Sequence, residues 1–253
     1  MPVPLDVFLL PSLVEAERLA GRIAVVIDVL RATTTIVHAL AAGASDVAVC
    51  GEVEEARRAA ASIPDSVLGG ERGGRPIDGF HLGNSPAEYT RQSAFGRTVV
   101  FTTTNGTRAM GRCAGARRVL LGAFVNFSAV CRELSAEVAG PVSAGITLVC
   151  AGTDGEVTRE DTLLAGAIVD DLVQTHAVQL ALNDQAEIAA DAWRACRQDL
   201  GGHDPLARAL RHSRGGRNLI EIGMENDIAI AAQIDKFDVV PVLDLATMRV
   251  VAA

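Results

Sequence analysis

Short apolar runs alternate with helix-like segments along this chain, and this alternation restricts the fold more than any other feature. Ile23–Val29 is a continuous apolar run broken only by Asp28, which is typical of a buried parallel strand. Ala32–Ala42 follows it with a helical pattern that ends at Gly43. The order then recurs in Asp46–Cys50 (strand), Val53–Ser62 (helix), Arg97–Thr102 (strand), Gly106–Cys113 (helix), Arg118–Leu121 (strand) and Ser128–Val138 (helix). Strands alternating with helices predict an α/β fold with a largely parallel sheet and right-handed crossovers.

The two halves of this alternating region also match in some of their residues. Ala42-Gly43-Ala44 and Ala114-Gly115-Ala116 lie 72 residues apart, and Thr35 and Thr107 have the same offset. An internal duplication of a strand–loop–helix unit would explain the match. Chance is the other explanation, because short alanine–glycine matches are common in an alanine-rich chain.

The second half of the chain is predicted to contain one more strand, followed mainly by helices. The strand is Ile146–Cys150, the helices are Asp161–Val173, Asp184–Leu200, Pro205–His212 and Asn226–Ile234, the glycine-rich loop is Ser213–Asn218 and the closing strand is Val239–Leu243. No regular structure is expected in the glycine-rich connection Leu68–Tyr89, and connections of this length are usually functional. The 253 residues are expected to form one unit, or two α/β lobes of about 1–140 and 141–253.

Composition excludes several classes of function. A net charge of −8 and a pI near 5.1 argue against nucleic-acid binding. Lys236 is the only lysine, which excludes a Walker-type phosphate loop elsewhere in the chain. The five cysteines are scattered without Cys-x-x-Cys spacing, so we expect reduced thiols rather than disulfides or a zinc cluster. Since no apolar run approaches the roughly 18 residues of a membrane helix and no signal peptide is evident, we expect a cytoplasmic protein that does not bind membranes.

Polar loops rich in threonine and glycine follow three of the predicted strands. They are Asp28–Thr35, Thr102–Arg108 and Cys150–Gly155. Ligands of parallel sheets gather at the carboxyl ends of the strands, where hydroxyls, N–H groups and helix N-termini can hold phosphate. The alternative is that these side chains only cap helices. Three such loops, each near a charged residue, favour anion binding.

Four carboxylates accompany these loops. Asp28 interrupts an apolar strand, where its charge must be balanced by a metal ion or by a cation such as Arg31. Glu71 lies between two glycine pairs that permit close approach of a ligand. Glu160 and Asp161 begin a helix, where the helix dipole alone could explain them. Oxygen ligands without thiolates or histidine clusters suit Mg²⁺.

Other chemistries lack their sequence patterns. The chain has no Gly-x-Gly-x-x-Gly after a strand, no Gly-x-Ser-x-Gly and no Cys-x5-Arg, which disfavours dinucleotide binding, an α/β-hydrolase and a cysteine phosphatase. We expect no cysteine to act as the nucleophile, because Cys150, the one nearest a proposed loop, ends a buried strand.

Together the polar segments resemble the 2-phosphosulfolactate phosphatase family, which comprises magnesium-dependent phosphatases linked to coenzyme M biosynthesis. The resemblance rests on Val26–Thr34, Gly70–Gly74, Gly83–Pro86, Thr103–Thr107, Cys150–Gly152, Glu160-Asp161 and Gly215–Leu219 with Asp227, in the family order. It implies a three-layer α/β/α fold and hydrolysis of 2-phospho-3-sulfolactate to 3-sulfolactate and phosphate. The alternative substrate is a related phosphorylated 2-hydroxy acid, and the alternative function is a non-catalytic sensor or carrier of an anionic metabolite.

The resemblance and the loop chemistry together assign roles to individual residues. The predicted Mg²⁺ ligands are Asp28, Glu71, Glu160 and Asp161, and the predicted catalytic residues are Asp28, Arg31 and Glu71. Whether Asp28 attacks phosphorus or only binds metal and water is left open. The predicted substrate-binding residues are Thr33, Thr34, Arg72, Asn84, Ser85, Asn105, Gly106, Thr107 and Arg217. Arg72, Arg75 and Arg217 are expected to hold the carboxylate and the sulfonate. The expected partner is a small anionic phosphate ester, and a homodimer is an open alternative.

Overall fold

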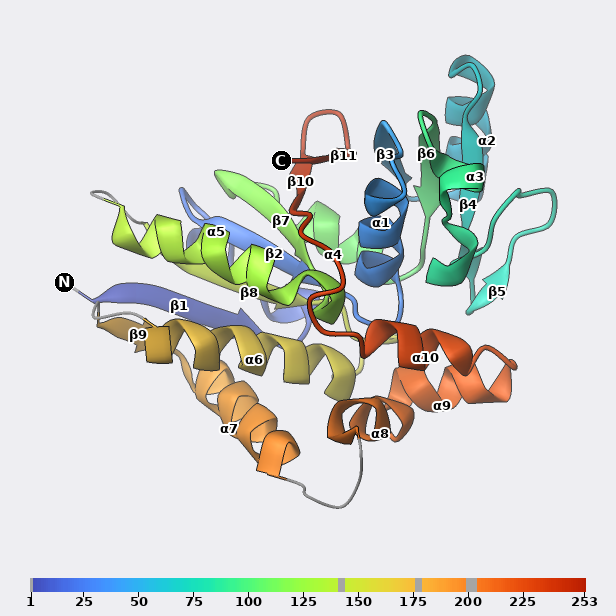
Figure 1. Ribbon diagram of the computed structural model, residues 1–253. Coiled ribbons are helices and arrows are strands. Elements are labelled where there is room, and N and C mark those ends of the chain that lie inside the picture. The colour runs from blue at the N-terminus through green and yellow to red at the C-terminus, as the bar shows by residue number, and fades with distance from the viewer. Residues whose placement is uncertain (1, 141–143, 176–178, 199–203) are drawn as a thin grey trace.

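A computed structural model describes residues 2–140, 144–175, 179–198 and 204–253, and these have the predicted α/β architecture (Figure 1). The strands of the described residues form one sheet in the order β5-β4-β6-β3-β11-β10-β7-β2-β8-β1-β9. Their bounds are β1 Val3–Phe8, β2 Ile23–Ile27, β3 Asp46–Cys50, β4 Val67–Arg72, β5 Arg75–Pro76, β6 Thr98–Thr102, β7 Arg118–Gly122, β8 Ile146–Cys150, β9 Leu180–Leu182, β10 Pro241–Asp244 and β11 Arg249–Ala252.

Two groups of parallel strands make up most of this sheet. One group is β7-β2-β8-β1-β9, and the other is β3-β6-β4. Three antiparallel pairings, β7 with β10, β10 with β11 and β11 with β3, join the groups, so the strand direction reverses between them. The groups lie at a steep angle to each other in Figure 1. The carboxyl ends of the two groups nevertheless lie close together. Gly106 follows β6 and Asp28 follows β2, and a Cβ added to Gly106 would lie only 2.9 Å from Oδ2 of Asp28.

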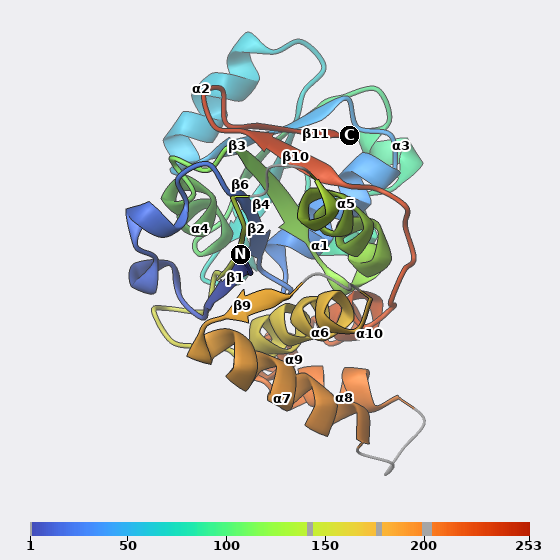
Figure 2. The ribbon, with the colours of Figure 1, turned by 90° about the vertical axis from the view of Figure 1, so that its left-hand side faces the viewer.

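Helices cover both faces of the sheet. They are α1 Ala32–Ala41, α2 Val53–Ser62, α3 Arg91–Ala94, α4 Gly106–Arg112, α5 Phe127–Ala139, α6 Arg159–Thr175, α7 Asp184–Gln198, α8 Pro205–Arg211, α9 Arg214–Glu221 and α10 Asn226–Ala231. Alternate residues of β2 face opposite layers: Val25 and Ile27 pack with α5 and α6, whereas Ala24 and Val26 pack with α4. Figure 2 shows α4 and α5 on opposite sides of the sheet. The fold is therefore a three-layer α/β/α arrangement, as predicted.

Most predicted elements are confirmed. Asp46–Cys50, Val53–Ser62 and Ile146–Cys150 match β3, α2 and β8 residue for residue. Other predicted ends differ by one to three residues, and Leu200, the predicted end of α7, lies outside the described residues. Three strands with no sequence prediction, β1, β9 and β11, complete the sheet.

The prediction of an irregular Leu68–Tyr89 is wrong. Val67–Arg72 is a strand of the sheet, parallel to β6, and β5 returns beside it. Its glycines face close neighbours, since a Cβ at Gly70 would lie 2.0 Å from the Thr102 carbonyl oxygen. Glycine here permits close packing of a strand, although its abundance is more typical of a loop.

The prediction of a loop at Ser213–Asn218 is also wrong. Ser213 caps α9 by accepting a hydrogen bond from the Gly216 N–H at 3.0 Å, and the helix begins at Arg214. Gly216 lies against the preceding helix, where an added Cβ would be 1.9 Å from the Leu210 carbonyl oxygen. The glycines therefore serve helix packing rather than loop flexibility.

The sequence left two questions about the organisation of the chain: whether it forms one unit or two lobes, and whether it contains an internal duplication. The parallel group that contains β2 and β7 also contains β8, so the sheet continues across residue 140. The strands of the two matching passages interleave, with β6 beside β3 and β7 beside β2, symmetrically about the β10–β11 hairpin. A duplication would produce such a placement, and the duplication itself stays a prediction.

All five cysteines are buried, and none of them forms a disulfide with another described residue. No helix among the described residues has the length and hydropathy of a membrane span.

The packing of Gly216 leads to a stability prediction. Alanine is intrinsically better than glycine in a helix by about 1 kcal/mol, so a helix site with free space should gain stability from the substitution. Gly111 of α4 has such space, because nothing lies within 4 Å of an added Cβ. We expect Gly216→Ala to lower the Tm in thermal unfolding and Gly111→Ala to maintain or raise it. Equal effects of the two substitutions would contradict the close packing at Gly216.

Candidate active site

A cleft of about 320 Å³ lies where the carboxyl ends of the two parallel groups meet, and α9 forms part of its wall. Its volume is at the lower end of the roughly 300–1,000 Å³ of small-molecule sites. Six residues with a predicted role line it: Asp28, Arg31, Glu71, Arg75, Asn84 and Asn105. The other lining residues are Leu30, Gly73, Gly74, Thr103, Thr104, Thr153, Asp154, Gly215, Asn218, Leu219, Glu221 and Ile222.

Asp28 comes directly after β2 and is only 7% exposed. Its Oδ1 accepts a hydrogen bond from the Ala32 N–H at 3.2 Å, at the start of α1. Its Oδ2 has no hydrogen bond from the described residues. Burial is the main cause that raises the pKa of Asp28 to about 7; the Ala32 hydrogen bond and Arg31 act to lower it, and the charges of Glu71 and Glu160 act to raise it. Asp28 therefore presents one free oxygen in a setting that disfavours its own charge.

Glu71, at the end of β4, fixes two backbone segments of the cleft. Its Oε2 accepts from the Gly74 N–H at 2.6 Å, and its Oε1 accepts from the Thr104 N–H at 2.9 Å. The first bond holds the turn between β4 and β5, and the second holds the loop after β6. Glu71 is thus both a cleft carboxylate and a support for the loops around it.

Asp161 and Glu160 lie behind the cleft lining at the start of α6. Both Asp161 oxygens accept backbone N–H bonds, Oδ1 from Val29 at 2.8 Å and Oδ2 from Gly152 at 3.0 Å. Glu160 Oε1 accepts from the Gly215 N–H at 3.1 Å, whereas its buried Oε2 has no hydrogen bond within the part of the chain that the structure describes. Burial raises the pKa of both carboxyls, and for Asp161 the charges of Asp28 and Glu160 add to the effect.

The charges of the cleft suit a cation. Four acids line it, Asp28, Glu71, Asp154 and Glu221, against two arginines, Arg31 and Arg75. No group of three or more His, Cys, Asp or Glu side chains in the described residues is close enough to form a complete protein metal cage. Mg²⁺ needs no such cage, because it binds through one or two carboxylates and keeps several waters. The free Asp28 oxygen, with Glu71 beside it, fits a magnesium site of this kind.

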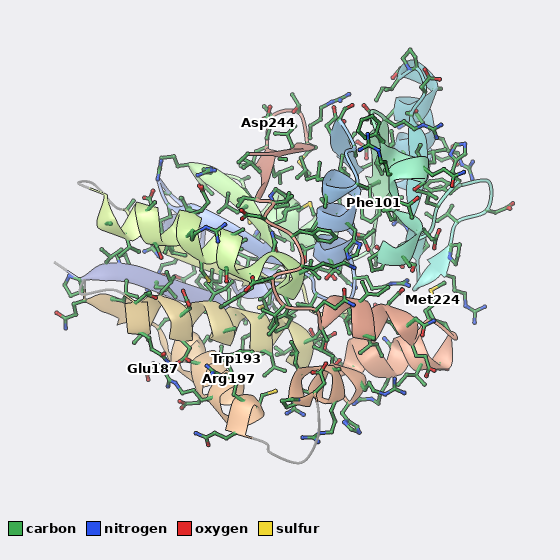
Figure 3. The ribbon with its side chains drawn as sticks, viewed as in Figure 1. Phe101, Glu187, Trp193, Arg197, Met224 and Asp244 are labelled. Atoms are coloured by element: carbon green, nitrogen blue, oxygen red, sulfur yellow. The ribbon has the colours of Figure 1, made fainter. Side chains whose placement is uncertain are left out.

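Arg31 is bound within the protein on several sides. Its Nη1 donates to Asp227 Oδ2 at 2.8 Å and to the sulfur of Met224. Met224 is labelled in Figure 3. The Nη2 of Arg31 donates to the Gly74 carbonyl oxygen at 2.9 Å. Both charged side chains of the Arg31–Asp227 pair are nearly inaccessible, at 3% and 4% exposure. The sequence alternative in which Arg31 pairs with Asp28 is wrong, because Asp227 is its ion-pair partner.

Several predicted substrate-binding residues lie outside the cleft lining. Thr33 and Thr34 are fully buried and donate their hydroxyls to the carbonyls of Asp28 and Val29. Arg72 donates to the carbonyl oxygens of Glu71 and Gly51 and to the Thr102 hydroxyl. These contacts hold the backbone and do not support the predicted contacts with phosphate.

Four further predicted residues have similar local roles. Ser85 donates to Asp227 at 2.6 Å, and Arg217 donates to the His212 carbonyl. Gly106 permits the close approach of α4 to Asp28, and Thr107 bonds the Thr103 hydroxyl through its N–H at 3.3 Å. None of the four lines the cleft.

Besides the free Asp28 oxygen, two buried side-chain atoms of the cleft residues have no hydrogen-bond partner among the described residues. Asn84 is 5% exposed and its Oδ1 is unbonded, and the buried Thr104 hydroxyl is also unbonded. Such groups usually meet a water or a ligand. Sequence reasoning assigned no role to Thr104, or to Asp227 beyond the family pattern, because an acid in the first turn of a helix is ordinarily explained by the helix dipole. The fold alone shows that Asp227 is buried against Arg31.

Cys150 is buried in the hydrophobic core and does not line the cleft. Burial, with the charges of Asp161 and Glu160, raises the pKa of its thiol well above the ordinary value. A thiol of this kind is a poor nucleophile at neutral pH.

The buried Arg31–Asp227 pair leads to a prediction about stability. Asp227→Asn keeps the shape of the side chain but leaves the Arg31 charge without its partner, so we expect a loss of about 3–5 kcal/mol in the free energy of unfolding by denaturant. Asp238→Asn is the matched control, because the Arg132–Asp238 pair is 62% and 82% exposed, and its removal should change less than about 1 kcal/mol. Similar losses for both variants would show that burial does not strengthen the Arg31 pair.

Burial of Asp28 makes stability depend on pH in the absence of divalent cations. Its folded-state pKa of about 7 lies above the ordinary value of 3.8, so the folded protein holds this proton more tightly than the unfolded chain. The stabilisation is complete below about pH 4 and is lost as the pH rises through 7, up to roughly 4 kcal/mol. In EDTA, Asp28→Asn should therefore gain Tm over the wild type progressively from pH 5 to pH 8. A Tm difference that is constant with pH would contradict this.

Known proteins resemble the chain over nearly its whole length. A family model described as 2-phosphosulpholactate phosphatase matches residues 8–245, which include every residue of the cleft. A relative from Symbiobacterium thermophilum is 44% identical over 229 residues, 90% of this chain and 93% of the relative. Relatives from Deinococcus radiodurans (43% over 222 residues, 87% of each chain) and Thermotoga maritima (39% over 222 residues, 88% of this chain and 89% of the relative) match similarly. All three are named probable 2-phosphosulfolactate phosphatase. By its sequence and over the whole of this cleft, the chain belongs to the 2-phosphosulfolactate phosphatase family.

Proposed function

We propose that this protein is a phosphatase that hydrolyses 2-phospho-3-sulfolactate to 3-sulfolactate and inorganic phosphate, with Mg²⁺ as its cofactor. Family membership supports hydrolysis of a phosphate monoester, and the substrate is taken from the name of the relatives, probable 2-phosphosulfolactate phosphatase. The observation that carries the proposal is Asp28: a buried carboxylate with one free oxygen, at a strand end, in a cleft of small-molecule size.

The excess of acids in the cleft supports a metal cofactor. A phosphate ester carries negative charge, and four carboxylates would repel it if only Arg31 and Arg75 opposed them. Bound Mg²⁺ neutralises phosphate charge and polarises the phosphoryl group. The same excess disfavours the alternative of a metal-free sensor or carrier, which would gain nothing from the acids.

Asp28 Oδ2 is the atom best placed for the chemistry. It is free of hydrogen bonds from the described residues, while Oδ1 is held by the start of α1. An ionised carboxylate oxygen without a hydrogen-bond partner can bind Mg²⁺, accept a proton from an attacking water or attack phosphorus directly. All three roles require the same free oxygen, so they are alternatives for Asp28.

The remaining cleft residues position the ester. Asn84 and Thr104 offer a side-chain amide and a hydroxyl that have no protein partner, and these can bond the ester oxygens. Glu71 keeps the backbone of both neighbouring loops in place, so the groups are held in position before the substrate binds.

Phosphate release from 2-phospho-3-sulfolactate tests the proposal. We expect turnover with Mg²⁺ or Mn²⁺, none after EDTA, and recovery when the metal is returned. Asp28→Asn should reduce kcat to less than about a tenth, a loss above ~1.4 kcal/mol in transition-state stabilisation. Cys150→Ser is the control and should retain kcat within about tenfold, because its thiol lies outside the cleft.

Three results would contradict parts of this proposal. Turnover that survives EDTA would exclude the metal, and a fully active Asp28→Asn variant would exclude the role of that carboxylate. Hydrolysis of another phosphorylated 2-hydroxy acid in preference to 2-phospho-3-sulfolactate would select the alternative substrate. A cytoplasmic location and a homodimer stay predictions from the sequence.

A further inference from the structure

The proposed substrate carries three anionic groups, and the cleft offers few cations for them. Besides the phosphate, 2-phospho-3-sulfolactate has a carboxylate on the carbon that bears the phosphate oxygen and a sulfonate one carbon further away. Arg31 and Arg75 are the arginines of the cleft lining. Arg31 already bonds Asp227, Met224 and Gly74, so most of its donors are in use.

Arg75 differs from the other candidate arginines because it is exposed and unpaired. Its backbone pairs with Arg72 in the β4–β5 hairpin, but its side chain has no hydrogen bond or ion pair among the described residues, although the residue lines the cleft. Arg72 and Arg217, which the sequence suggested equally, are bonded to backbone carbonyls and do not line the cleft. Within the described part of the chain, Arg75 is thus the cleft cation that is free for a ligand.

The backbone before Arg75 is held by two residues of the cleft. Gly73 and Gly74 have φ values of 59° and 79°, which a two-residue hairpin turn of type I′ requires. The Gly74 N–H donates to Glu71, and its carbonyl accepts from Arg31. Because both sides of Gly74 are fixed in this way, Arg75 begins from a defined position beside the acids.

A second polar group lies on the same wall. An added Cβ at Gly83 would be 3.5 Å from Pro76 Cγ, so the segment leading to Asn84 packs beside β5. Arg75 supplies a charged fork and Asn84 an unbonded amide, which together can hold a tetrahedral anion through several oxygens.

We propose that Arg75 binds the sulfonate of the substrate and so determines its selectivity. The carboxylate stays near the phosphate because both are attached through the same carbon. The sulfonate is one carbon further away and can reach an exposed residue at the wall of the cleft. This inference rests on the proposed function.

Two substrates that differ only in the sulfonate test this inference. 2-Phospholactate keeps the phosphate and the carboxylate but has a methyl group where the substrate has its sulfomethyl group. Arg75→Ala should lower kcat/KM for 2-phospho-3-sulfolactate by ten- to a thousandfold, mainly through KM, and lower that for 2-phospholactate much less. Arg75→Lys should lie in between, because lysine keeps the charge but not the fork. Arg58→Ala, which removes an exposed arginine of α2 outside the cleft, should change neither value.

Calorimetric binding of 3-sulfolactate gives a second measurement that needs no turnover. We expect Arg75→Ala to weaken this binding at least tenfold at an unchanged Tm. Equal losses with both esters, or undiminished binding of 3-sulfolactate, would overturn the role of Arg75. If the wild type binds 3-sulfolactate through Arg75 but does not hydrolyse the phosphate ester, the proposed function fails while the role of Arg75 stands. If the wild type does not bind 3-sulfolactate at all, the role of Arg75 fails.

Discussion

The guanidinium of Arg31 connects three parts of the protein that surround the cleft. It follows β2 in the chain, pairs with Asp227 at the start of α10 and bonds the Gly74 carbonyl in the β4–β5 turn. A charge at this depth is tolerated only with complete partners, since an unpaired buried ion costs several kcal/mol. The hairpin and α10 therefore have to be in place together. Glu71 then depends on the same turn, because it accepts a hydrogen bond from the N–H of Gly74, whose carbonyl oxygen accepts from Arg31.

Asp28 gains its properties from this arrangement. Several loops bring the carboxylate oxygens of Asp28, Glu71 and Asp161 close together, where their charges repel one another. Backbone N–H groups form hydrogen bonds with only some of these oxygens. Asp161 and Glu71 have both oxygens bonded, whereas Asp28 and Glu160 each have one oxygen left without a partner. Asp161 thus mainly holds loop backbone, Glu71 holds loop backbone and also lines the cleft, and Asp28 is the cleft carboxylate with an oxygen left for a ligand or a cation.

Much of the fold could be predicted from local sequence patterns. The apolar run before Asp28 and the loops after β6 and β8 indicated which strands end in polar residues. The cleft does lie at the ends of these strands. The pattern could not show how β6 comes near β2, because these strands are not neighbours: the β10–β11 hairpin reverses the sheet between them. Glycine was misleading for a physical reason, since Gly70 and Gly216 serve close packing and not flexibility.

Charged residues were harder to place than elements. Arg31, Arg72, Arg75 and Arg217 have the same chemistry in the sequence, and only their partners in the fold distinguish them. Arg31 is buried against an acid 196 positions away, and Arg72 and Arg217 are bonded to backbone carbonyls. Thr33 and Thr34 look like phosphate ligands but satisfy carbonyls of their own loop. No local pattern contains the long-range contacts that decide these roles.

The position of the β10–β11 hairpin also has a consequence for the order of assembly during synthesis. All strands of both parallel groups precede this hairpin in the chain, yet among the described strands the hairpin is what joins the two groups by backbone pairing. While the chain emerges from the ribosome, each group can pair its own strands, but the continuous sheet has to wait for residues 241–252. The cleft lies between the two groups, so its final shape is set only after residues 241–252 have been synthesised and have paired with β7 and β3.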